Sequence, residues 1–177
     1  MTPDRSLDAD RWAEAALDAF ERGGAAAVAV EPIARALGVT KGSFYWHFKN
    51  RDALLAAAVG RWERLHVDAV LDAAATIADP HQRLNAILGA ASSKPPTIFL
   101  KMLEGVAEPV VAAAVTRAAE LRVAFLERAF RDVGLTPAVA RRQALLAYSA
   151  YIGRALLSRD APDLIGDERK LAQHIGK

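Results

Sequence analysis

The tight turn Gly38-Val39-Thr40, between two short helical segments, constrains the fold of this chain more than any other feature. Residues 30–38 carry an apolar stripe, and Gly38 suits the left-handed position that ends a helix. Thr40 suits the cap of a second helix, which we expect to begin at Lys41. Two short helices joined by such a turn predict a helix-turn-helix.

The second helix combines basic and aromatic side chains in a way that folding alone does not explain. No acidic residue lies between Glu31 and Asp52. Phe44 and Phe48, four residues apart, can pack inward together, which leaves the polar and aromatic side chains on another face. In a helix-turn-helix the second helix enters the DNA major groove, so this face predicts DNA contact. The predicted DNA-binding residues are Thr40, Lys41, Gly42, Ser43, Tyr45, Trp46, His47 and Lys49.

Phosphates and base edges are the two kinds of group that these residues suit. The candidates for phosphate contact are Lys41, Tyr45, His47 and Lys49, and those for base edges are Thr40, Lys41 and Ser43. Gly42 permits a close backbone approach. The alternative is a merely solvated face, which is the usual fate of a charge run. Exposed rings argue against that alternative, although Trp46 can instead pack internally.

The segment around this turn resembles the DNA-binding signature of the TetR family of bacterial repressors. The resemblance rests on Ile33-Ala34, on the run from Leu37 to Phe48 with its Gly-Ser-Phe-Tyr-Trp-His-Phe core, and on the following residues 49–55. It covers roughly residues 10–60. One departure is Ala29, where the family usually places Ser or Thr before a helix, and a lost cap costs about 1 kcal/mol.

Helical periodicity continues through the rest of the chain, and no stretch shows the two-residue alternation of a strand. We therefore expect an all-α fold of about nine helices, with a helix-turn-helix domain at 1–50 and a helical effector-binding and dimerisation domain at 51–177. Besides the two short helices, the expected helices span about 8–22, 50–77, 80–93, 98–106, 109–133 and 137–159, with a loop at 161–163 and a short helix from 167.

Nothing in the sequence nominates an active site. The chain has no cysteine, and it lacks both the phosphate-cradling glycine motifs and Gly-x-Ser-x-Gly. Its histidines, His47, His66, His81 and His174, show no metal-ligand spacing. We therefore expect no catalytic residue, no metal and no cofactor, and the chain is not expected to be an enzyme.

Charge and hydropathy place the chain in solution rather than in a membrane. The net charge is only +2, so the basic signal is local, in the acid-free window before Asp52. The amino terminus lacks a signal-peptide profile, and no apolar run approaches the roughly 20 residues that span a bilayer. We expect a soluble, cytoplasmic protein with no membrane partner.

The resemblance also implies a ligand pocket and a dimer interface in the carboxy-terminal domain. The candidate ligand residues are Trp62, Phe99, Leu103, Phe125 and Tyr148. For any one of them, ordinary core packing is the alternative. The candidate dimer residues, on a stripe of mostly small side chains in the last long helix, are Ala140, Ala144, Ala147, Tyr151, Ala155 and Leu156. This stripe can equally pack within the chain.

The resulting functional hypothesis is a homodimeric repressor that a small, largely apolar ligand releases from a palindromic DNA operator. Two rival hypotheses remain. One is a constitutive DNA-binding protein without an effector, which no apolar compound would release from its operator. The other is a small helical enzyme or carrier, which would need ionisable groups converging on the apolar body.

Overall fold

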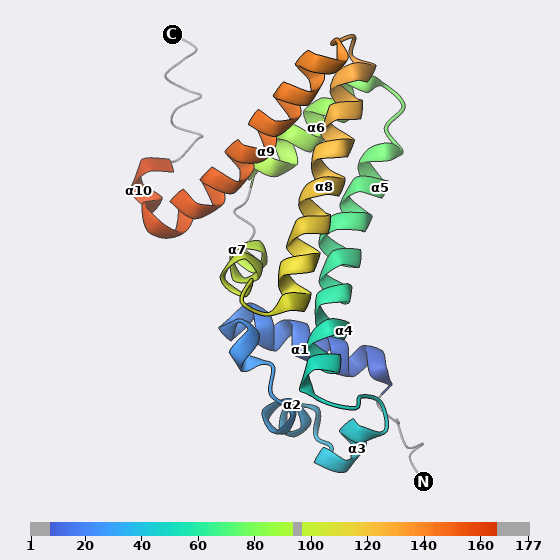
Figure 1. The fold of residues 1–177 in the computed structure, drawn as a ribbon, viewed down its shortest axis with the longest axis vertical. Helices are drawn as coiled ribbons and strands as arrows, with labels where there is room; N and C mark the ends of the chain where they lie inside the picture. Colours follow the sequence, from blue (N-terminus) through green and yellow to red (C-terminus); the bar gives the residue numbers. More distant parts are fainter. Residues whose placement is uncertain (1–7, 94–96, 166–177) are drawn as a thin grey trace. The chain divides into compact units, whose positions relative to one another are not determined.

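The computed structural model describes residues 8–93 and 97–165, and the regular elements within these ranges are all helical (Figure 1). The all-α prediction is thus confirmed for this part of the chain. The elements are α1 (Ala9–Gly23), the 3-10 turn η1 (Ala25–Ala27), α2 (Val30–Leu37), α3 (Lys41–Tyr45), α4 (Arg51–Glu63), the π-helical turn η2 (Arg64–Asp68), α5 (Ala69–Ala75), α6 (Pro80–Ser93), α7 (Thr97–Glu104), α8 (Pro109–Asp132), α9 (Pro137–Asp160) and α10 (Pro162–Ile165).

Because α4, η2 and α5 follow one another without a break, the described ranges contain nine continuous helices, which is the number expected, although α10 is not one of the predicted helices. The loop predicted at 161–163 is wrong, because α10 begins at Pro162. Proline suits the first turn of a helix, and Asp163 beside it favours the positive end of the helix dipole. The helix expected from residue 167 lies outside the described residues.

The chain forms two compact units. The first consists of Met1–Asp72 with Lys101–Glu120, and the second of Ala73–Leu100 with Leu121–Lys177. The first unit contains the helix-turn-helix and also the turn between α7 and α8. The domain boundary predicted at residue 50 stays a prediction.

Aromatic packing forms the core of the first unit. The apolar stripe of α1 is buried as its periodicity predicts, with Trp12 and Phe20 at 1% exposure or less. The Trp12 and Phe44 rings meet edge to face, with centroids 5.4 Å apart, and the Phe44 and Phe48 rings stack at 5.7 Å. This packing fixes α3 against α1, because edge-to-face and offset contacts favour particular ring orientations.

The long helix predicted from Asn50 is present, but a π-helical turn interrupts its regular hydrogen bonding. Asn50 caps it, since its Oδ1 accepts from the Ala53 amide at 2.9 Å. The π turn at Arg64–Asp68 follows Glu63, whose carboxylate accepts two hydrogen bonds of 2.9 Å from Arg117 on α8. The sequence carries no signal for this turn, because its residues are compatible with an ordinary α-helix.

The second unit is held together by contacts among α6, α7, α8 and α9. The Arg83 side chain of α6 donates to Asp132 Oδ2 at 2.8 Å and to the Ile77 carbonyl at 2.9 Å. Phe99, Tyr148 and Tyr151 form an aromatic cluster, with the Phe99 and Tyr151 centroids 5.4 Å apart and those of Tyr148 and Tyr151 6.2 Å apart.

Candidate nucleic-acid interface

The turn between α2 and α3 is built as the sequence predicts. Gly38 ends α2 in the left-handed region, at a φ of 70°, and the Val39 amide donates back to the Ala34 carbonyl at 3.0 Å. Thr40 then caps α3, because its Oγ1 accepts a hydrogen bond from the Ser43 amide at 3.4 Å. The helix-turn-helix prediction is confirmed at this level. Ala29, at the start of α2, makes no side-chain cap, as its residue type requires.

Helix α3 and the turn that follows it have a buried inner face and an exposed outer face. Phe44 is fully buried, and Phe48 is 9% exposed. On the outer face the exposed fraction is 58% for Tyr45 and 87% for Trp46, so the alternative in which Trp46 packs internally is wrong. Aromatic rings left this open to water are unusual unless a partner covers them.

All eight predicted DNA-binding residues are accessible to solvent. Ser43 is half-buried, and the other seven are exposed. One detail of the prediction needs correction, because α3 ends at Tyr45 and Lys49 therefore does not share its face. Lys49 lies instead in the turn that leads into α4. The chain turns here because the His47 and Phe48 amides both donate to the Phe44 carbonyl, at 3.0 Å each.

An ion pair crosses the helix-turn-helix. Lys41, the first residue of α3, donates from Nζ to Glu31 Oε1 at 2.8 Å, and Glu31 lies in the first turn of α2. The hydrogen bond to Glu31 raises the pKa of Lys41 and lowers that of the carboxylate, so both groups stay charged near neutral pH. Glu31 was missed by sequence reasoning, since its ten-residue separation from Lys41 is no recognised spacing.

Arg51 is a second residue whose role the sequence did not reveal. At the start of α4 it donates from Nε to the Val28 carbonyl at 3.1 Å and from Nη2 to the Ala25 carbonyl at 2.6 Å. Its Nη1 donates to Glu108 Oε1 at 2.9 Å. These contacts fix the loop between α1 and α2, and so they position the helix-turn-helix.

The five predicted ligand residues do not form one group within either unit. Trp62 and Leu103 belong to the first unit, and Phe99, Phe125 and Tyr148 belong to the second. Within the second unit, Phe99 and Tyr148 both contact Tyr151, and the Arg122 guanidinium lies 5.2 Å from the Phe99 ring centroid. A cavity of about 440 Å³ in the first unit lies between α1 and α2, and none of the predicted ligand residues lines it.

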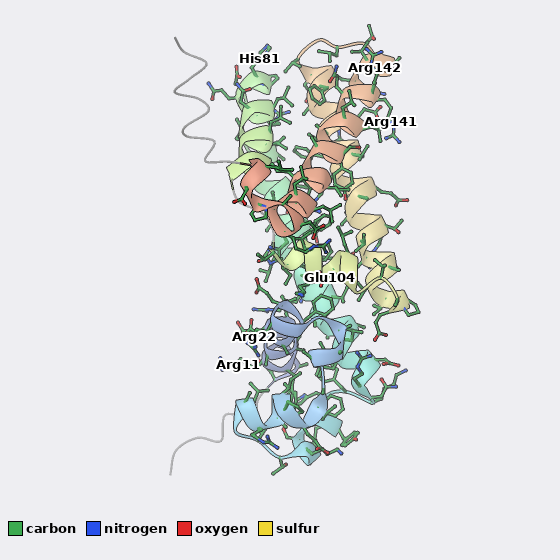
Figure 2. The ribbon with its side chains drawn as sticks, turned by 90° about the vertical axis from the view of Figure 1, so that its left-hand side faces the viewer. Arg11, Arg22, His81, Glu104, Arg141 and Arg142 are labelled. Carbon is green, nitrogen blue, oxygen red and sulfur yellow. The ribbon has the colours of Figure 1, made fainter. Side chains whose placement is uncertain are left out.

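The predicted dimer residues are largely turned into the chain itself. Ala140, Ala144 and Ala155 are at most 1% exposed, and their burial favours the alternative of packing within the chain. Ala147, Tyr151 and Leu156 are half-buried. The large apolar side chains that α9 leaves exposed are Leu145, Leu146 and Leu157, at 46%, 57% and 44%. Figure 2 labels two arginines of the same helix, Arg141 and Arg142.

The described residues contain neither a cluster of metal-ligating side chains nor a helix suited to a membrane. No group of three or more histidine, aspartate or glutamate side chains there could hold a metal ion. Among the same residues, no helix combines the length and apolarity needed to cross a bilayer.

A comparison with known protein families finds one matching segment. Residues 13–58 match the family described as bacterial regulatory proteins, tetR family. The matched range runs from within α1 to within α4, and it includes every predicted DNA-binding residue.

Proposed function

Because this chain is a TetR-family transcriptional regulator with a DNA-binding helix-turn-helix, we propose that it acts as a homodimeric repressor of a palindromic operator. In this proposal a small ligand releases the repressor from DNA. Its place of action is the bacterial cytoplasm, where the operator lies.

The outer face of the α3 segment carries this proposal. Tyr45 and Trp46 expose large rings to solvent while the Phe44 ring beneath them is fully buried. A helix whose inner face is locked in a core can present its outer face to a duplex in one orientation. In our proposal Tyr45, His47 and Lys49 contact phosphates, and Thr40, Lys41 and Ser43 lie close to base edges.

The short length of the helix that contacts DNA is the reason for proposing a dimer. One short helix contacts few base pairs, whereas two heads about 34 Å apart contact successive major grooves of a palindrome. The exposed leucines of α9, Leu145, Leu146 and Leu157, support an interface on this helix. They replace the buried alanines as our main interface candidates, with Ala147, Tyr151 and Leu156 at their margin.

Release by a ligand requires a coupling between the ligand site and the heads. A coupling of about 1 to 3 kcal/mol changes DNA affinity about 5- to 150-fold. Within the second unit, the cluster of Phe99, Tyr148 and Tyr151 is the candidate ligand region, since aromatic side chains commonly line ligand pockets. Trp62, Leu103 and Phe125 remain candidates from the sequence.

Binding-site selection from genomic DNA with the purified full chain tests this function. A palindromic motif with half-sites one helical turn apart supports both DNA reading and two-fold symmetry. The matched control is the double variant Tyr45→Ala/Lys49→Ala, which should enrich no motif. If the unmodified protein enriches no sequence, the proposal is wrong.

A further inference from the structure

The Glu31–Lys41 ion pair lies where the proposed function requires a contact with DNA. Both side chains are open to solvent, at 66% for Glu31 and 53% for Lys41. Exposed ion pairs contribute little to folding, because solvent screens both charges and ordering two long side chains costs entropy. Stabilising the fold is therefore a weak reason for placing a carboxylate against the first residue of α3.

The ion pair with Glu31 distinguishes Lys41 from Lys49, the other lysine of the interface. Lys49 makes no ion pair with any described residue, so its charge is balanced by mobile ions from the solvent. Lys41 carries a fixed counterion instead. When Lys49 meets a phosphate, it gains a charged contact and mobile counterions are released. When Lys41 does so, the Glu31 carboxylate is brought close to the negatively charged DNA backbone, whether or not the ion pair persists, and the two negative charges repel each other.

A base pair can satisfy both members of the ion pair at once. In the major groove a guanine offers the acceptors O6 and N7, and its paired cytosine offers the N4 amino donor next to O6. Lysine binds the guanine acceptors, and glutamate accepts from the cytosine amino group. An ammonium and a carboxylate held 2.8 Å apart match this neighbouring acceptor and donor.

Resting on the proposed function, we propose that Glu31 and Lys41 act as one specificity-determining pair that reads a single G·C base pair in each half-site. On DNA without this G·C base pair, Glu31 opposes contact between Lys41 and phosphate and so weakens binding to random sequence. Glu31 thereby raises the ratio of operator to random-DNA affinity, although it is an acidic residue on a surface that binds a polyanion.

Salt titrations with a random-sequence duplex test the counterion role. The variants Glu31→Gln and Glu31→Ala free Lys41 for phosphate contact, and we expect random-DNA affinity to rise about 5- to 10-fold at moderate salt. The slope of log affinity against log salt should steepen by about 0.9, the value for one added phosphate contact. Glu120→Gln, which removes one exposed carboxylate from α8, is the matched control for net charge. Equal slopes in Glu31→Gln and in the unmodified protein overturn this role.

Binding-site selection with Glu31→Ala tests the base-reading role. We expect the variant to lose the preference for G·C at one position of each half-site and to keep the rest of the motif. An identical motif from both proteins overturns the reading of a base pair by Glu31. Failure of the unmodified protein to bind any DNA is a different result, which contradicts the proposed function itself. Thermal unfolding of both variants should stay close to that of the unmodified chain, so these outcomes do not depend on misfolding.

Discussion

Arg51 and Glu108, 57 residues apart in the chain, form an ion pair with an Nη1–Oε1 distance of 2.9 Å. The pair joins the start of α4 to the residue before α8, within the first unit. The same guanidinium donates to two backbone carbonyls of the loop between α1 and α2. One side chain therefore connects three segments of the chain, which a planar guanidinium with five donors can do and an ammonium cannot.

Arg51→Lys should destabilise the protein although it keeps the charge. The single side-chain nitrogen of lysine cannot reach the three acceptors that Arg51 binds through three nitrogens, so at least one part-buried carbonyl loses its partner. We expect a loss of about 1 to 3 kcal/mol in the free energy of unfolding. Glu108→Gln should cost less, about 1 kcal/mol or below, because both groups are about one-third exposed. Urea unfolding measures both values. Arg142→Lys on α9 (Figure 2) is the control, and an equal effect there would contradict the proposed role of Arg51.

Tyr45→Ala combined with Lys49→Ala should abolish operator binding at physiological salt and leave the melting temperature nearly unchanged. Both side chains are exposed, so their removal creates no cavity. Gel-shift titration and thermal unfolding of the same preparation measure the two properties. Undiminished binding would show that these side chains do not contact DNA.

Gly105→Ala should destabilise the turn between α7 and α8. A Cβ atom there would lie 3.1 Å from Phe20 Cζ and 3.3 Å from both the Lys101 carbonyl and Val111 Cγ1. Since Phe20 is buried, its ring cannot yield freely, and we expect a loss of about 1 to 3 kcal/mol from overpacking. Gly89→Ala in α6 meets no atom within 4 Å and should instead stabilise the protein by about 0.5 to 1 kcal/mol. Chemical unfolding that shows the same sign for both variants would refute this reasoning.

Local rules explain which features could be predicted from sequence. Gly38, Thr40 and Phe44 act on neighbours within a few residues, so the turn, the cap and the buried face of α3 were all predictable. The Glu31–Lys41 contact depends on how two helices cross, which no spacing encodes. The small residues of α9 show the same limit, since their pattern fits packing against the chain or against a second copy equally well.

The dimer proposal predicts that charge on the exposed leucines of α9 separates the subunits. Leu146→Lys combined with Leu157→Lys places two ammonium groups on a surface that the proposed interface would bury, where their desolvation is costly. We expect a shift from dimer to monomer in light scattering and a loss of operator affinity, because one head alone reads too few base pairs. Leu164→Lys on α10, where the leucine is 76% exposed, is the control. A variant that remains dimeric would exclude these leucines from the interface.

Burial of two tyrosines predicts a loss of stability in alkali. Burial raises the pKa of Tyr148 and of Tyr151 against the opposing effect of the nearby Arg122 cation. The folded state thus holds its phenolic protons more tightly than the unfolded chain, whose tyrosines titrate near pH 10. Stability from this source is complete below about pH 10 and falls as the pH rises towards the higher folded-state values.

Tyr148→Phe combined with Tyr151→Phe should therefore flatten the decline in unfolding free energy above about pH 10, where the tyrosines of the unfolded chain lose their protons. Urea unfolding across this range, with ultraviolet detection of tyrosinate, measures the effect. Tyr45→Phe is the control, because that residue is 58% exposed and removing its hydroxyl should leave the decline unchanged. If the unfolding free energy of the double variant declines as steeply as that of the unmodified protein, the alkaline loss has another source, because the variant lacks both phenolic protons.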